Sequence, residues 1–190
     1  EAFGRGLQGD DPVYLKAAAC AKHFAVHSGP EWNRHEFNAE NISLRDLYET
    51  YLPAFKALVQ EGHVAEVMCA YNRYEGEPCC GSNRLLSQIL REEWGFEGLV
   101  TSDCWAVSDF WGGHKYSPDK PTATSSALRA GTDVECGDSY GNLVEAVKRG
   151  LVTEEEIDLH LRRLLTARFR LGDFDSDELV EWRRISSSVV

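Results

Sequence analysis

Short apolar runs alternate with segments of helical periodicity along most of this chain. The runs that read as strands lie within residues 16–24, 64–71, 99–102 and 132–134. The expected helices lie at 43–61, 85–93, within 126–136, at 142–149 and at 153–170. Gly62 ends the first of them, and a capping box of Thr153 and Glu156 begins the last. Strands and helices that alternate at this spacing predict an α/β fold with a parallel sheet.

The number of these units points to part of a barrel. Four βα units are about half of a (β/α)8 TIM-like barrel. The 190 residues, 43% of them hydrophobic, are enough for one globular unit. A half barrel leaves two open sheet edges and an uncovered interior. We therefore expect a fragment that needs a partner segment, with the barrel over 1–174 and a polar linker over 175–190.

Polar side chains stand where the predicted strands end. Lys22 and His23 follow the first strand, Tyr71 the second, Asp103 the third and Glu135 the fourth. The carboxyl ends of barrel strands carry catalytic side chains, so these residues should share one rim. A carboxylate among hydrogen-bonding groups suits sugar chemistry, with Asp103 free to attack carbon. The plain alternative is that Asp103 only caps the next helix.

The six cysteines fit no zinc pattern, because the sequence has no Cys-x-x-Cys pair. We expect those in or beside strand-like runs to be small buried apolar residues: Cys20, Cys69, Cys104 and Cys136. Cys79 and Cys80 lie in a turn-rich segment, where a disulfide is an open alternative. The six histidines show no paired ligand spacing on a helix, and His160 is expected to be a surface or packing residue. We expect no metal and no cofactor.

Charge and hydropathy exclude some partners. A formal net charge of −11 argues against nucleic acid and anionic membrane surfaces. No stretch approaches the about 18 apolar residues of a membrane span.

Several motifs give the chain a specific resemblance. They are Ala21-Lys22-His23-Phe24, Val67-Met68-Cys69-Ala70-Tyr71-Asn72, Leu99-Val100-Thr101-Ser102-Asp103, Arg34 with Phe37-Asn38-Ala39, Gly76-Glu77-Pro78 and Arg129-Ala130-Gly131-Thr132-Asp133. In this order and spacing, over about residues 1–175, the chain resembles glycoside hydrolase family 3, in particular its bacterial β-glucosidases and β-xylosidases. The likeness places it in the C-terminal half of the N-terminal catalytic barrel.

The resemblance implies a hydrolase that removes terminal non-reducing β-D-glucosyl or β-D-xylosyl residues. Asp103 would be the nucleophile of a retaining mechanism with a covalent glycosyl-aspartate intermediate. The sugar subsite would be lined by Lys22, His23, Arg34, Met68, Tyr71 and Trp105. The substrate would be an oligosaccharide or another β-glycoside, and the likeness suggests a periplasmic or extracellular location.

The same resemblance implies missing parts. Family members of this type take their acid/base glutamate from a second domain, expected beyond Val190, and further sugar ligands from the first half of the barrel, upstream of Glu1. Residues 175–190 would lead toward that second domain. We therefore expect the chain alone to hydrolyse unactivated substrates poorly, and full activity to need both missing parts.

Three other functions stay open. The β-N-acetylhexosaminidases of the family use an Asp-His dyad on the loop after Lys-His; His35 falls at that histidine, but Asn33 replaces the aspartate. A non-catalytic sugar-binding remnant would stack pyranose rings on Trp32, Trp105 and Trp111. Lys22 at a strand end would also suit the Schiff base of an aldolase.

Overall fold

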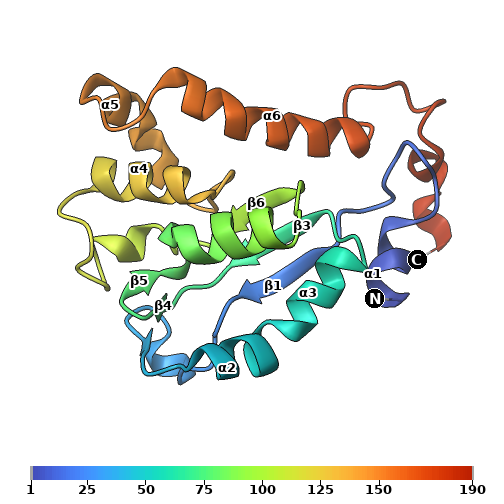
Figure 1. Ribbon diagram of the computed structural model, residues 1–190. Helices are drawn as coiled ribbons and strands as arrows, with labels where there is room; N and C mark the ends of the chain where they lie inside the picture. Colours follow the sequence, from blue (N-terminus) through green and yellow to red (C-terminus); the bar gives the residue numbers. More distant parts are fainter. Residues whose placement is uncertain (1, 190) are drawn as a thin grey trace.

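Three parallel strands form the centre of the computed structural model, which describes residues 2–189. They are β1 (Cys20–Phe24), β3 (Glu66–Cys69) and β6 (Leu99–Ser102), hydrogen-bonded in the order β1-β3-β6. Figure 1 shows α3 (Pro53–Gln60) below β1 and α6 (Glu154–Arg170) above β6. This arrangement confirms the predicted α/β class with parallel βα units.

A small second sheet lies beside the carboxyl ends of these strands. It consists of β2 (Asn38–Ala39), β4 (Arg73–Tyr74) and β5 (Glu77–Pro78), with β2 and β4 parallel and β4 and β5 antiparallel. The remaining helices are α1 (Ala2–Gln8), α2 (Leu44–Asp46), α4 (Lys120–Ala130) and α5 (Leu143–Lys148). Short 3-10 helices include η1 (Glu31–Asn33), η3 (Cys79–Gly81), η5 (Ser108–Phe110), η6 (Ser139–Asn142), η7 (Glu181–Arg184) and η8 (Ser187–Val189).

The hydrophobic core lies between the main sheet and the helices. Val67 and Val100 are fully buried at the centre of the sheet, and Phe24 packs edge-on against Phe55 and Trp94. Side chains alternate between the two faces of a strand, so the neighbours of Val67 point the other way. Those neighbours, such as Glu66 in β3, are half-exposed. The sheet therefore packs one face against the helices and leaves the other partly open.

The predicted helix over 43–61 is interrupted. A π-helical turn, η2 (Leu47–Tyr51), separates α2 from α3, and the N–H of Leu52 donates to the carbonyl of Leu47. Proline lacks an N–H and fits the start of a helix, so Pro53 begins α3. The predicted helix at 85–93 forms as the π-helix η4 (Arg84–Glu93). The capping box at the start of α6 is confirmed.

The predicted fourth strand is wrong in its extent. Only one bridge forms there, between Thr101 of β6 and Val134. The Asp133 carboxylate accepts a hydrogen bond from the Val100 N–H at 2.8 Å. That N–H therefore does not donate to a backbone carbonyl of the segment over 132–134, as it would in a ladder. The segment consequently runs beside β6 without a continuous ladder. The helix expected within 126–136 begins earlier than predicted, at Lys120, where Asp119 caps it through the N–H of Thr122.

Asp133 is the centre of a buried ionic cluster that joins three elements. Its side chain is 0% exposed and accepts from Arg91 of η4 at 2.7 Å. Its Oδ1 also lies 2.7 Å from His160 Nδ1 and 3.0 Å from Arg163 Nη1, both on α6. A buried carboxylate needs such partners because burial removes its hydration. His160, expected as a surface or packing residue, is thus a buried packing residue.

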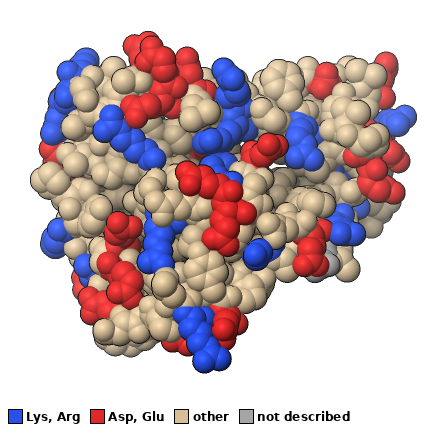
Figure 2. Space-filling model, viewed as in Figure 1, with Lys and Arg blue, Asp and Glu red and all other residues tan. Residues whose placement is uncertain are grey.

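The surface and the chain ends have two further features. Figure 2 shows acidic and basic side chains interspersed on the face that it draws, with acidic ones over the start of α6. After α6 the chain returns to the N-terminal region, where the Trp182 ring N–H donates to the carbonyl of Tyr14 at 3.3 Å. Among residues 2–189, no helix has the length and apolar character needed to cross a membrane.

Replacing Asp133 by asparagine should destabilise the protein. The change leaves the partly buried Arg91 and Arg163 without their anion, which costs about 3 kcal/mol of unfolding free energy. Chemical denaturation of Asp133→Asn measures this loss. The control is Asp158→Asn, an exposed position of α6 with the same change of charge, which should stay near the wild-type value. Equal unfolding free energies for the two variants would contradict the role given to the cluster.

Candidate active site

Asp103 lies directly after β6, close to side chains from β1 and from the segment after β3. Its Oδ2 is 3.2 Å from Nε2 of His23 in β1, and the side chains are 14% and 26% exposed. The Tyr71 hydroxyl, after β3, lies close enough to the Asp103 carboxylate for that charge to raise its pKa. Parallel strands end at one edge, which explains why residues far apart in sequence meet there. The predicted rim of His23, Tyr71 and Asp103 is therefore present.

Asp103 does not cap the next helix. Its Oδ1 accepts the N–H of Cys104 at 2.8 Å, and η5 begins only at Ser108, after Val107. One carboxylate oxygen is thus fixed by the adjacent backbone, while the other faces His23. This geometry keeps the carboxylate at the rim of the sheet.

His23 is a neutral partner for this carboxylate near pH 7. Burial lowers the pKa of its imidazole, and the nearby Lys22, His27 and Arg34 lower it further, while Asp103 opposes the shift. A neutral imidazole can donate its Nε2 proton to the carboxylate. Burial also raises the pKa of the Tyr71 hydroxyl, and the Asp103 carboxylate adds to that rise. Both neighbours therefore keep protons that can be shared with Asp103.

The other predicted sugar-site residues lie around this group. Lys22 is exposed on β1, and Met68 is half-buried in β3 beside Thr101 of β6. The Arg34 guanidinium carbon lies 5.0 Å from the ring centre of Tyr71. Trp105 is 55% exposed.

The backbone at Trp105 is unusual. It has a left-handed φ of 69°, a conformation that side chains such as tryptophan rarely adopt. Its N–H donates to the Cys136 carbonyl at 2.6 Å. The backbone of the loop after β6 is thus bonded to the segment that follows Val134.

Other aromatic and acidic candidates have different roles. Trp32 is 85% exposed on η1, whereas Trp111 packs against the core with Lys120 over its ring. Glu135 turns one carboxylate oxygen to the backbone N–H groups of Ser139 and Tyr140, at 3.0 and 3.4 Å. Glu135 therefore holds η6 from a position directly after Val134, the residue that bridges β6.

A contact between His35 and Asp109 was not predicted. His35 Nδ1 lies 2.8 Å from Asp109 Oδ2, and Arg34 Nε donates to His35 Nε2 at 3.1 Å. The carboxylate that Asn33 does not supply therefore comes from η5. No local pattern reveals the pair, because its members are 74 residues apart.

Two disulfides correct the expectation that the cysteines near strands are apolar filling. Cys69 bonds Cys80, and Cys104 bonds Cys136, with Cα–Cα distances of 5.1 and 4.3 Å. The apolar surroundings suit a buried thiol and a buried disulfide equally, so only the fold distinguishes them. Cys104 follows Asp103, so the second bridge ties the loop of the carboxylate to the segment after Val134. Cys79, one of the two residues for which a disulfide was left open, is a free buried thiol.

The comparisons with known proteins agree with this geometry. The profile of the Glycosyl hydrolase family 3 N terminal domain matches residues 1–167. The chain belongs to glycosyl hydrolase family 3. It is 58% identical over 189 residues to a xylan 1,4-beta-xylosidase of Xylanibacter ruminicola, covering 98% of this chain and 22% of that protein.

Solved structures of glycosyl hydrolase family 3 show the same fold. A family 3 exo-beta-xylosidase in complex with a xylobiose aziridine activity-based probe matches 95% of this chain and 24% of its own, with a TM-score of 0.88 and 33% identity. A beta-glucosidase from Erythrobacter marinus matches 92% of this chain and 24% of its own, with a TM-score of 0.84 and 32% identity. The chain thus spans about a quarter of the length of these relatives.

The disulfides predict a thiol count. Unfolding the protein in guanidinium without reductant should expose two thiols per chain, from Cys20 and Cys79. Titration with a thiol reagent measures the number, and a reduced sample supplies the control with all six cysteines reactive. Six reactive thiols in the unreduced sample would show that neither bridge forms.

His114, buried on the loop after η5, predicts a pH dependence of stability. Burial lowers its pKa to about 4, whereas an unfolded histidine titrates near 6.5. Between these values the unfolded state binds more protons, so stability is full above about pH 6.5 and falls as the pH drops toward 4. Between pH 7 and pH 4 this difference removes about 3 kcal/mol from the unfolding free energy.

The measurement is chemical denaturation at both pH values. His114→Phe should lose this part of the pH dependence. His63→Asn, at an exposed position, should keep it. A wild-type pH dependence in His114→Phe would contradict the assignment.

Proposed function

We propose that this chain forms the nucleophile side of a retaining β-glycosidase site, with Asp103 as the nucleophile. The observation that carries the proposal is the carboxylate of Asp103 at the carboxyl end of β6, facing His23 and Tyr71. Membership of glycosyl hydrolase family 3 supports a hydrolytic role. The reacting sugar would lie over the rim formed by these residues.

The proposed reaction needs a carboxylate that is ionised and held in place. The Asp103 carboxylate attacks the anomeric carbon, the glycosidic C–O bond breaks, and its electron pair leaves with the aglycone oxygen. An acid protonates that oxygen, and water later hydrolyses the glycosyl ester and restores the carboxylate. The neutral His23 imidazole, 3.2 Å from the carboxylate, would orient Asp103 without removing its charge.

We propose a terminal β-D-xylosyl residue as the preferred substrate group, with β-D-glucosyl as the alternative. The relative that is 58% identical is a xylan 1,4-beta-xylosidase, whereas the Erythrobacter marinus relative is a beta-glucosidase at 32% identity. Lys22, Arg34, Met68 and Trp105 are the proposed sugar-binding residues beside His23 and Tyr71. Their amine, guanidinium and aromatic groups suit sugar hydroxyls and ring faces.

Two further parts of the proposal concern context. An oxidising compartment, periplasmic or extracellular, is supported by the bridges Cys69–Cys80 and Cys104–Cys136. Cleavage of unactivated glycosides is proposed to need segments from the rest of the length that the relatives have.

The nucleophilic step is testable by itself with dinitrophenyl 2-deoxy-2-fluoro-β-xyloside, because dinitrophenolate leaves without an acid. We expect one sugar adduct per chain on the Asp103 peptide, found by intact mass and peptide mapping. The glucoside analogue should label more slowly. A hybrid, in which this chain replaces the matching 189 residues of the Xylanibacter ruminicola relative, tests the same step in a longer protein.

Two variants make the test specific. Asp103→Asn keeps the shape of the side chain and should abolish labelling. Asp158→Asn removes an exposed carboxylate on α6 and should label like the wild type. A folded chain and a folded hybrid that both stay unlabelled, or carry the label elsewhere, would refute Asp103 as the nucleophile.

A further inference from the structure

Asp109, His35 and Arg34 form a continuous hydrogen-bonded chain next to the candidate nucleophile. Asp109 Oδ2 lies 2.8 Å from His35 Nδ1, and Arg34 Nε lies 3.1 Å from His35 Nε2. Asp109 comes from η5, after β6, while the other two residues come from the loop after β1. The chain of contacts thus joins two loops at the rim.

The partners fix the protonation state of His35. The arginine Nε carries a proton and can only donate, so His35 Nε2 must accept. The remaining imidazole proton is therefore on Nδ1 and is donated to Asp109. His35 in this arrangement is neutral, with both ring nitrogens engaged.

Asp109 is well placed to hold this tautomer. Its side chain is 14% exposed, and its backbone carbonyl accepts the N–H of His114 at 2.7 Å. Burial raises the pKa of the Asp109 carboxyl, and the hydrogen bond from His35 opposes that rise. The partly buried carboxylate thus gains its stabilisation from His35.

The same imidazole also contacts the nucleophile's neighbour. The His35 ring packs edge-on against Tyr71, with 4.6 Å between ring centres, and the Arg34 guanidinium lies over that ring at 5.0 Å. Tyr71 in turn lies near Asp103, whose charge raises the pKa of the Tyr71 hydroxyl. Arg34 also pairs with Glu31, so its side chain is held from two sides.

We propose that Asp109 and His35 are positioning residues that set the orientation of Arg34 for binding the non-reducing sugar. The proposal rests on the proposed function, because it assigns Arg34 to the sugar subsite. A direct acid/base role of His35 fits the geometry less well, since Nε2 is occupied by Arg34. The Asp-His pair that Asn33 cannot form with His35 is thus formed by Asp109. We assign it to positioning Arg34, not to proton transfer.

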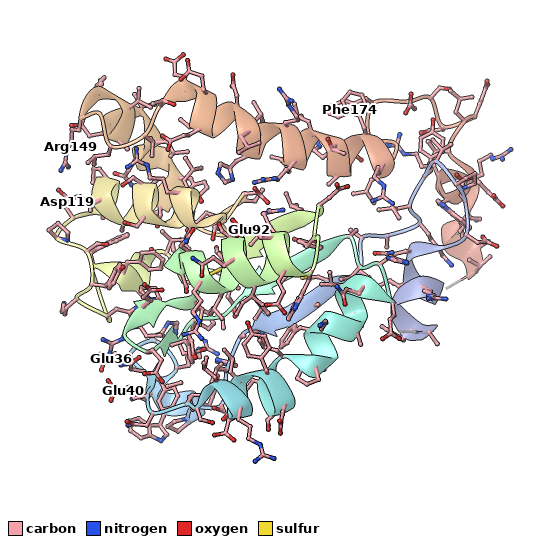
Figure 3. The ribbon with its side chains drawn as sticks, viewed as in Figure 1. Glu36, Glu40, Glu92, Asp119, Arg149 and Phe174 are labelled. Atoms are coloured by element: carbon pink, nitrogen blue, oxygen red, sulfur yellow. A yellow bond between two sulfur atoms is a disulfide. The ribbon has the colours of Figure 1, made fainter. Side chains whose placement is uncertain are left out.

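Matched substitutions separate the two nitrogens of His35. In His35→Asn the amide nitrogen replaces Nδ1, so the contact with Asp109 stays and the acceptor for Arg34 is lost. In His35→Gln the amide oxygen replaces Nε2, so the acceptor for Arg34 stays. Glu36→Gln removes a neighbouring exposed carboxylate without touching the chain of contacts, and Figure 3 shows Glu36 on this loop.

The experiment measures inactivation of the hybrid by the fluoro-xyloside, which gives the inactivator concentration at half-maximal rate and the maximal rate separately. We expect His35→Asn and Asp109→Ala to raise the half-maximal concentration about tenfold, because Arg34 is misplaced, with little change in the maximal rate. Glu36→Gln should stay near the wild type, and His35→Gln, which keeps the acceptor for Arg34 but loses the donor to Asp109, should lose less than His35→Asn. In an Arg34→Ala background, His35→Asn should add nothing further, as expected for residues acting through one group.

Nitrogen NMR of His35 should show the tautomer with the proton on Nδ1. Wild-type half-maximal concentrations in His35→Asn and Asp109→Ala, additive losses with Arg34→Ala, or a proton on Nε2 would overturn the proposal while labelling of Asp103 still supports the function. If Asp109→Ala does not fold, Asp109→Asn, which keeps an acceptor oxygen, should match the wild type, and a tenfold loss there would overturn the proposal. A folded hybrid without any label would refute the proposed function, and this proposal with it.

Discussion

The buried carboxylate of Asp133 determines how the strand that carries Asp103 is held. It binds the N–H of Val100 inside β6 while its charge is balanced by Arg91 and Arg163. One side chain therefore connects β6 to both η4 and α6. A buried carboxylate of this kind adds little net stability compared with an apolar replacement. It does restrict how β6, η4 and α6 can pack, because any other arrangement would leave its charge without partners. The position of β6, and with it the rim of the sheet, follows from that requirement.

From that fixed strand, the rim is built by separate constraints on each loop. The bond between Cys104 and Cys136 ties the residue after Asp103 to the segment after Val134. The bond between Cys69 and Cys80 ties the end of β3 to η3. Covalent links at these points suit a site whose groups must keep their geometry in a partly open sheet. Charge pairs such as Asp119 with Arg149, both labelled in Figure 3, join the start of α4 to the end of α5.

The sequence predicted the parts of this structure that depend on local patterns. The three main strands follow from apolar runs, and the meeting of His23, Tyr71 and Asp103 follows from parallel strands ending at one edge. The predicted fourth strand failed because a side chain, Asp133, took a hydrogen bond that a ladder would have used. The disulfides were not predicted, because an apolar sequence context is the same for a buried thiol and for a disulfide.

The pair of His35 and Asp109 shows most clearly what local reasoning misses. Asn33 stands where the dyad of the family has its aspartate, and an amide supplies no charge to the imidazole. The fold brings Asp109 to within 2.8 Å from a loop 74 residues away. The electrostatic requirement of an imidazole is satisfied by any carboxylate at the right distance, whatever its place in the sequence. A missing residue in a motif therefore excludes a local arrangement only, and the interaction itself has to be sought among all the loops at the same rim.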